Sequence, residues 1–179
     1  MKNLLVLIIA LFAFFGCGED ESSSANFKEF SPNEEVKLVD VSGKELTLVR
    51  KDHGFAIKND ENKVLMIDIF GTFCPPCQKE AAELTKYQLE NKDKFTLIGL
   101  THFENVTNEY VLHEFMQKFN AYYFITNDQK INDRLAEQIV RDIEYKHEIA
   151  LPFKVVIKNG EYQILTDVDS GQYGVKYYL

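Results

Sequence analysis

Two cysteines, Cys74 and Cys77, are separated by two prolines and follow a strongly apolar segment, residues 64–70. This spacing is typical of thiol–disulfide exchange when the first cysteine opens a helix, because the unpaired N–H groups and the dipole of the helix N-terminus stabilise a thiolate. Such thiols have pKa values of about 3.5–7.5. We therefore expect Cys74 to be the attacking sulfur. Cys77, one helical turn later and less exposed, would resolve the mixed disulfide.

Two other interpretations of the cysteine pair are less favoured. A zinc site would require two more ligands at suitable spacing, but the four histidines are scattered along the sequence, at His53, His102, His113 and His147. His102 follows an expected strand near the same end of the sheet. A histidine there could influence the site, but the favoured interpretation is a surface histidine. A purely structural disulfide would close so small a loop that it would add little stability. We therefore expect redox chemistry, with no bound metal and no cofactor.

The elements that must position this pair alternate between strands and helices. Residues 64–70 and 95–101 are apolar runs of the kind found in buried strands. A helix is expected from Pro75 to about Asn91, since proline is well tolerated in a first helical turn. The other expected elements are strands 36–41 and 46–49 in a hairpin, helices 108–119 and 131–143, a strand at 122–125, and strands 153–157 and 162–166 joined across Asn159–Gly160. This order predicts an α/β fold with a mixed sheet.

Three segments together resemble the thioredoxin superfamily, and most closely its TlpA-like or ResA-like branch of membrane-anchored bacterial thiol–disulfide oxidoreductases. They are VLMIDIFGTFCPPCQKE (64–80), LPFKVVIKNGEY (151–162) and DVSGKELTL (40–48). The resemblance implies a thioredoxin-like fold: a central mixed β-sheet flanked by helices, with an added N-terminal β-hairpin and a small helix–strand insertion. The residues after Gly171 are too few for the helix that normally closes this fold, so either the helix is missing or the sequence is a truncated product.

The same resemblance implies catalytic roles by position. Cys74 would be the nucleophile and Cys77 the resolving thiol. Asp68 matches a buried acid that exchanges a proton with the resolving thiol, although a strand edge facing water would also accommodate an acid there. Glu80 matches a glutamate of this branch and would tune the pKa values of the cysteines from one helical turn away. A solvated helix face is the alternative for Glu80.

The resemblance also implies a substrate-binding surface, made of Phe73, Pro75, Pro76, Leu151 and Pro152. Phe73 replaces the tryptophan that usually precedes the first cysteine, which keeps a hydrophobic platform without an indole N–H. Pro75 and Pro76 hold the turn between the cysteines rigid. Pro152 would be a cis-proline that leaves the Leu151 backbone available to pair with an extended substrate strand, unless it simply begins a strand.

The N-terminus carries the pattern of an export signal. Lys2 precedes 12 apolar residues, 4–15, which are too few for a spanning helix of about 20 residues but suit a signal peptide. Gly16-Cys17 then resembles the lipobox of bacterial lipoproteins, which implies cleavage before Cys17 and its lipidation. An uncleaved anchor and an ordinary signal peptide are the alternatives. We expect a signal peptide at 1–16, a lipidated tether at 17–29 and a thioredoxin-like domain at 30–179.

Composition narrows the possible functions. The 179 residues are 45% hydrophobic and carry a formal net charge of −8, which suits one domain with a real core and argues against binding nucleic acid. No glycine-rich phosphate-binding motif occurs. We expect a lipid-anchored enzyme facing the periplasm in the bacterial cell envelope. The resemblance to the thioredoxin superfamily implies that it would reduce protein disulfides, such as those of apocytochrome c or of a copper site in an oxidase, and be re-reduced by a membrane thiol carrier. A disulfide oxidant or isomerase of the same fold and a copper-delivery module remain open alternatives.

Overall fold

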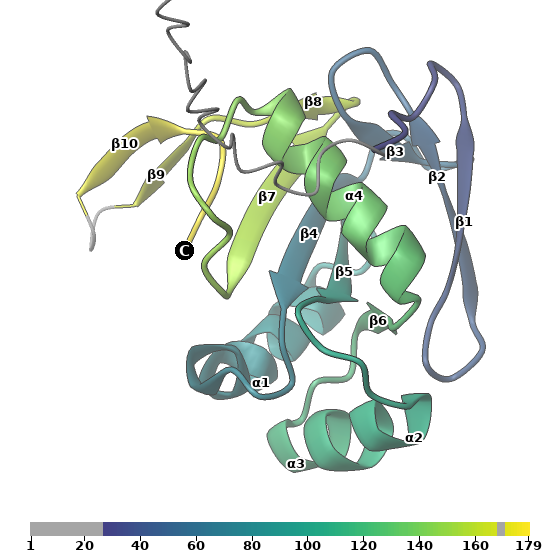
Figure 1. Cartoon of the computed structure of the whole chain (residues 1–179), viewed down its shortest axis with the longest axis vertical. Coiled ribbons are helices and arrows are strands. Elements are labelled where there is room, and N and C mark those ends of the chain that lie inside the picture. Colours follow the sequence, from purple (N-terminus) through teal and green to yellow (C-terminus); the bar gives the residue numbers. More distant parts are fainter. Residues whose placement is uncertain (1–26, 168–170) are drawn as a thin grey trace, which may run out of the picture.

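Strand β4 (Val64–Phe70) lies at the centre of a five-stranded mixed sheet with the strand order β6–β5–β4–β7–β8 (Figure 1). β5 (Phe95–Thr101) pairs parallel with β4, and β6 (Phe124–Thr126) parallel with β5. β7 (Phe153–Lys158) pairs antiparallel with β4, and β8 (Glu161–Tyr162) antiparallel with β7. This computed structural model describes residues 27–167 and 171–179. The predicted α/β class, the mixed sheet and the bounds of both central strands are confirmed.

Helices pack on both faces of this sheet. α1 (Pro75–Glu90) follows β4 directly. α2 (Asn108–Tyr110), the π-helical turn η2 (Val111–Met116) and α3 (Gln117–Phe119) form one helical stretch over the predicted range 108–119. α4 (Gln129–Asp142) begins two residues before the apolar pattern does, because the Asp128 carboxylate caps it by accepting a hydrogen bond from the Ile131 N–H at 3.1 Å.

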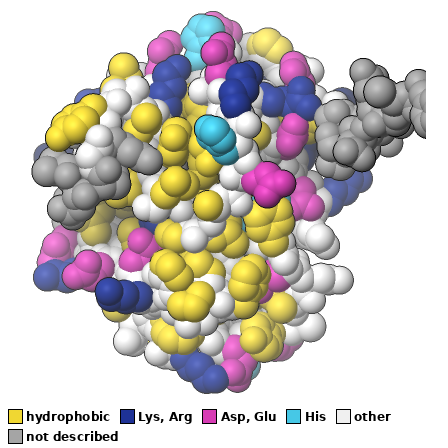
Figure 2. All heavy atoms as spheres, turned by 60° about the vertical axis from the view of Figure 1, so that its left-hand side comes forward, with side chains coloured by type: hydrophobic (Ala, Val, Ile, Leu, Met, Phe, Trp, Pro, Cys, Tyr) yellow, Lys and Arg dark blue, Asp and Glu magenta, His cyan; other side chains and the backbone are white. Residues whose placement is uncertain are grey.

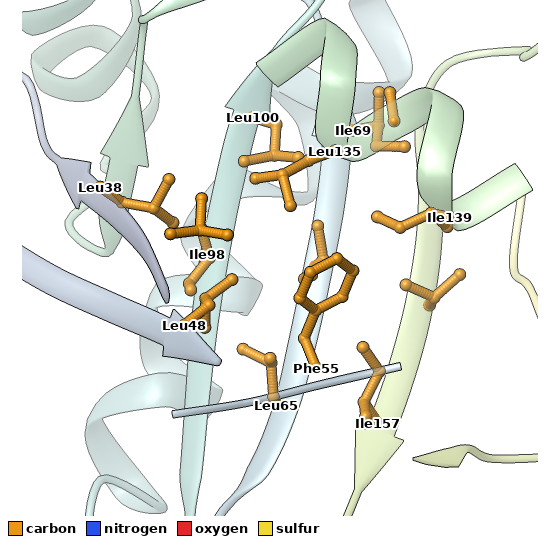
Figure 3. Packing of buried hydrophobic residues seen from close by; sticks show 14 of the residues in the cluster. Leu38, Leu48, Phe55, Leu65, Ile69, Ile98, Leu100, Leu135, Ile139 and Ile157 are labelled. Carbon is orange, nitrogen blue, oxygen red and sulfur yellow. The ribbon is translucent and has the colours of Figure 1, made fainter. Parts of the chain in front are cut away.

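Alternate side chains of β4 point into two hydrophobic clusters, one on each face of the sheet. Ile67 and Ile69 belong to the cluster beneath α4, which also receives Leu48 from the N-terminal strands (Figure 3). Phe70 belongs to the opposite cluster, which holds the two cysteines and Phe115 of η2. The sheet therefore separates the cluster beneath α4, which contains no cysteine, from the side that carries the expected chemistry.

A three-stranded antiparallel sheet precedes the central one and consists of β1 (Glu35–Val39), β2 (Glu45–Arg50) and β3 (Phe55–Ile57). The predicted hairpin is confirmed, whereas β3 was not predicted, because three residues are too few to show strand alternation. Arg50 at the end of β2 forms a buried ion pair with Asp142 at the end of α4. This pair attaches the added sheet to the helix layer.

The chain departs from the prediction after β8. The expected strand 162–166 is cut short, and a separate hairpin of β9 (Leu165–Asp167) and β10 (Gln172–Val175) follows. The cause is that Tyr178 occupies the position on β7 that a longer β8 would need, where its backbone and that of Lys154 exchange two hydrogen bonds of 2.8 Å. Tyr177 stacks on Phe153, with ring centroids 5.4 Å apart. After β8, the described chain therefore returns to β7 as an extended segment.

No helix within residues 27–167 and 171–179 is long and apolar enough to cross a membrane. The expected signal peptide and Cys17 lie outside the described residues.

Candidate active site

Cys74 caps the N-terminus of α1. Its backbone is extended, with φ −82° and ψ 113°, and its sulfur accepts a hydrogen bond from the Cys77 N–H at 3.4 Å. Pro75 and Pro76 fill the first helical positions, where the missing N–H groups cost no intrahelical bond. The sulfur therefore lies at the positive end of the helix dipole, where a thiolate is stabilised.

Cys74 and Cys77 are joined in a disulfide, with their Cα atoms 5.3 Å apart. Both residues are buried, Cys74 at 5% and Cys77 at 2% exposure, so the expected difference in exposure between the two is small in this oxidised form. They pack against Phe70 and Ala81 in the cluster beneath α1. The fold thus places a dithiol–disulfide pair at the end of its central strand.

Gly71, Thr72 and Phe73 connect β4 to Cys74. The Cys74 N–H donates to the Gly71 carbonyl at 3.1 Å and closes a tight turn. The Phe73 ring is 56% exposed and folds back over Gly71, where a Cβ atom would lie 2.6 Å from the ring. A glycine at this position therefore allows an aromatic ring to stand exposed next to the disulfide.

The Leu151–Pro152 peptide bond is cis. Phe153 pairs with Ile69 across β7 and β4, so this bond lies beside the end of β4 that leads to the cysteines. Pro152 is buried, and Leu151 packs against the cluster that contains the disulfide. The structure therefore brings these two residues to the same edge of the sheet as Cys74.

The surface around this edge is partly apolar. Pro75, Pro76 and Phe73 are exposed on the turn that carries the disulfide, and Phe103 is exposed after β5. Hydrophobic side chains gather through the centre of one face of the molecule, with charged side chains toward its margins (Figure 2). An open groove of about 850 Å³ runs beside Phe103 and is also lined by Ile149. Exposed apolar side chains thus lie near the disulfide, beside a groove that also carries charged residues such as Asp133 and Glu137.

Three charged side chains meet between β4, β7 and α1. Asp68 and Lys154 stand opposite each other across the two strands, and Lys154 Nζ lies 3.6 Å from Asp68 Oδ1 and 2.6 Å from Glu80 Oε1. The Asp68 carboxylate is buried at 1% exposure, and neither of its oxygens has a hydrogen-bond partner in the described part of the chain. Glu80 lies one turn of α1 after Cys77. A buried lysine therefore links the two acids that the sequence pointed to separately.

The environment of Asp68 changes its ionisation. Burial raises the pKa of Asp68 from its ordinary 3.8 to about 6; Lys154 opposes this change, and the negative charge of Glu80 adds to it. The pKa of Tyr123 is also raised well above its ordinary value, first by burial and then by the charges of Asp68 and Glu80. Asp68 is therefore mostly ionised near neutral pH but can hold a proton under mildly acidic conditions.

Two residues of this region were missed or misplaced by the sequence patterns. Lys154 was not singled out, because a lysine in a short apolar strand gives no local sign of burial. The prediction of a surface position for His102 was wrong. Its side chain is only 11% exposed, because α4 covers the end of β5 and brings Asp133 Oδ1 to 2.8 Å from His102 Nδ1. No cluster of three or more His, Cys, Asp or Glu side chains that could hold a metal occurs in the two described ranges.

Known proteins resemble this chain in structure more than in sequence. No family model and no curated protein sequence matches it. A solved Bacteroides thetaiotaomicron structure, named as a candidate protein disulfide isomerase, superposes with a TM-score of 0.53 and 21% identity over 84% of this chain and 78% of its own. A thiol:disulfide interchange protein of the thioredoxin family from Chlorobium tepidum gives 0.50 and 19% identity over 73% and 79%.

A third solved structure extends the match over more of its own length. The thioredoxin domain of a thiol-disulfide oxidoreductase from Bacteroides vulgatus superposes with a TM-score of 0.50 and 16% identity, covering 84% of this chain and 89% of that one. Together with the sheet order and the cysteine pair that begins α1, these matches define a thioredoxin-like fold.

Proposed function

We propose that this protein is a thiol–disulfide oxidoreductase that reduces disulfides in partner proteins. One observation carries the proposal: Cys74 caps α1, accepts a hydrogen bond from the Cys77 N–H, and is joined to Cys77 in a disulfide. A helix N-terminus stabilises the thiolate that exchange requires. The names of the similar solved structures, a thiol:disulfide interchange protein and a thiol-disulfide oxidoreductase, support the same chemistry.

The reaction begins with the reduced pair. The Cys74 thiolate attacks one sulfur of a substrate disulfide, which forms a mixed disulfide and releases the other substrate sulfur as a thiolate that takes a proton. Cys77, once deprotonated, attacks the Cys74 sulfur and releases the second substrate thiolate. The substrate gains two electrons, and the enzyme ends as the Cys74–Cys77 disulfide. A membrane thiol carrier then restores the dithiol.

Asp68 would serve as the proton acceptor for Cys77. Its carboxylate is buried on the same face of the sheet as the cysteine cluster, and its pKa of about 6 suits reversible protonation near neutral pH. Lys154 keeps the acid ionised enough to accept a proton, and Glu80 orients the lysine through its 2.6 Å contact. In this proposal Glu80 acts through Lys154 rather than on the cysteines directly.

The exposed residues around the disulfide would bind the substrate. Phe73, Pro75 and Pro76 form an apolar rim, and the Leu151 backbone before the cis Pro152 would pair with an extended segment of the partner. The Cys74–Cys77 disulfide has little exposed surface, so the partner must reach it at this rim. An apocytochrome c whose cysteines must be reduced before haem attachment is the substrate that the sequence resemblance suggests.

The decisive test measures disulfide reduction by the purified, pre-reduced protein. Replacing Cys74 with Ser should abolish turnover, and Cys77→Ala should trap mixed disulfides at Cys74 that identify partners by mass spectrometry. Cys17→Ser is the matched control and should leave turnover unchanged. A redox titration gives the direction: a potential near about −270 mV supports a reductant, and one near about −120 mV an oxidant. Full activity of Cys74→Ser would refute the mechanism.

We also propose that the protein is anchored in the bacterial cell envelope by a lipid on Cys17 and faces the periplasm. The support is the apolar segment 4–15 followed by Gly16-Cys17. Mass spectrometry of the mature N-terminus should find an acylated Cys17, and Cys17→Ala should move the protein from the membrane to the soluble envelope fraction. An unmodified Cys17 in the mature protein would contradict the anchor and leave the redox function in place.

A further inference from the structure

Glu104, in the loop between β5 and α2, binds the segment that carries Cys74. Its Oε1 accepts a hydrogen bond from the Thr72 N–H at 2.8 Å, and its Oε2 accepts one from the Thr72 hydroxyl. Thr72 is buried and lies two residues before Cys74. Hydrogen bonds to a carboxylate are among the stronger ones in proteins, so this contact fixes both the backbone and the side chain of Thr72.

The third polar group of Thr72 is held from the other side. The Gln78 side chain, one residue after Cys77, donates from Nε2 to the Thr72 carbonyl at 2.7 Å. The N–H, the hydroxyl and the carbonyl of Thr72 are therefore bound by residues from two separate elements. Through Thr72, the segment 71–74 is thus hydrogen-bonded both to the β5–α2 loop and to the first turns of α1.

We propose that Glu104 is a positioning residue for Cys74, which it holds at the helix N-terminus through Thr72 when the disulfide is open. The inference rests on the proposed thiol–disulfide function. Reduction removes the bond between the two sulfurs, so the hydrogen bonds of Thr72 then act together with the backbone and the packing of the surrounding cluster to keep the Cys74 sulfur in place. A misplacement of about 1 Å can slow a reaction up to about 100-fold. A sulfur that leaves the helix N-terminus also loses the stabilisation of its thiolate.

Three variants of the whole protein separate position from charge. Glu104→Ala removes both hydrogen bonds to Thr72. Glu104→Gln keeps both without the charge, because the amide oxygen can accept from the Thr72 N–H and the amide nitrogen can donate to the hydroxyl. Glu109→Ala is the matched control, since Glu109 is an exposed acid of the adjoining α2 whose carboxylate makes no hydrogen bond within the described residues.

Two readouts are needed: the rate of disulfide reduction, and the pH midpoint of Cys74 alkylation in the reduced protein. We expect Glu104→Ala to lower the rate by about tenfold and to move the alkylation midpoint to higher pH. Its melting temperature should also fall, because the buried Thr72 N–H and hydroxyl lose their hydrogen-bond partner. Glu104→Gln and Glu109→Ala should stay within about twofold of the wild type, which is the scatter expected for surface changes. If Glu104→Ala does not fold, Thr72→Val, which removes only the hydroxyl contact, should give a smaller change in the same direction.

The outcomes are distinguishable. An unchanged rate and an unchanged midpoint in Glu104→Ala overturn the inference while Cys74→Ser still tests the function. Equal damage in Glu104→Gln and Glu104→Ala also overturns it, because the charge and not the contact would then matter. A wild type that reduces no disulfide, with the midpoint shift of Glu104→Ala preserved, overturns the proposed function and supports the positioning role.

Discussion

Asp68 and Lys154 face each other across β4 and β7, with 3.6 Å between Oδ1 and Nζ, and both side chains are buried. The lysine lies closer to Glu80, at 2.6 Å, than to Asp68. The Lys154 ammonium group thus contacts both carboxylates. Burial raises the pKa of Asp68 to about 6, and the negative charge of Glu80 adds to this change, in spite of the opposing ammonium group of Lys154.

Asp68→Asn should change how stability depends on pH. The folded-state pKa of Asp68 lies above its ordinary 3.8, so the folded chain binds the proton more tightly than the unfolded chain, and the resulting stability is lost as pH rises from about 4 to about 6. Above that range the ionised, buried Asp68 costs about 3 kcal/mol. The variant lacks this cost and should gain stability over the wild type between pH 4 and 7 in urea titrations. If the difference in free energy of unfolding between Asp68→Asn and the wild type does not change between pH 4 and 7, the pKa of Asp68 is not raised.

Lys154→Met should destabilise the protein most at neutral pH. It leaves Asp68 and Glu80 close together without their cation, and breaking a buried pair costs about 3–5 kcal/mol. At pH 5, where Asp68 holds a proton, the loss should be smaller. Lys158→Met is the matched control, because Lys158 lies on the same face of β7 but is exposed. Its free energy of unfolding should change by less than about 0.5 kcal/mol. Equal losses at pH 5 and pH 7 would contradict the arrangement of the three charges.

Gly71 and Phe73 should behave as a coupled pair in substrate binding. Phe73→Ala removes an exposed ring, so we expect little change in melting temperature but a KM for protein disulfides that rises about three- to tenfold, which corresponds to roughly 1 kcal/mol of apolar contact. Gly71→Ala should raise KM as well. A Cβ atom at position 71 would lie 2.6 Å from the Phe73 ring, so the ring would have to move. In the Phe73→Ala background, Gly71→Ala should add nothing. Additive effects would show that the ring does not depend on the glycine.

Arg50 should be far more important for stability than the exposed ion pairs. Its guanidinium holds Asp142 in a two-bond contact, and Tyr162 and Gln138 also donate to the same carboxylate, at 3.0 Å and 2.8 Å. We expect Arg50→Ala to lower the free energy of unfolding by about 3–5 kcal/mol. Lys37→Ala, which breaks an exposed pair with Glu45, should cost less than about 1 kcal/mol. Chemical denaturation measures the free energy of unfolding of both variants. Similar losses in Arg50→Ala and Lys37→Ala would refute the role of burial.

Features set by local chemistry could be predicted from the sequence. The strand 64–70, the cysteine that opens a helix and the turn at Asn159–Gly160 each depend on a few neighbouring residues, and all three are present in the structure. The positive φ angles of Asn159 and Gly160 are those expected for a tight hairpin. Asp68 was suspected because an acid inside an apolar strand requires an explanation.

Features set by distant contacts could not be predicted in this way. Lys154 is buried only because Asp68 and Glu80, far away in the sequence, come to it on other elements. The contact of Glu104 with Thr72 joins two loops that are 32 residues apart, and the sequence around Glu104 carries no recognisable pattern. The short β8 follows from the competing backbone of Tyr178. In each case the sequence contains both residues of the contact, but nothing in it indicates that the two lie together in the fold.

The division of the interior by the central sheet has a practical consequence for protein engineering. The cluster beneath α4 contains neither cysteine, while the cluster beneath α1 contains both. Efforts to raise thermal tolerance can therefore redesign the first half of the interior, around Leu135 and Ile139, and leave the cysteine pair of the second half, with its proposed exchange chemistry, untouched.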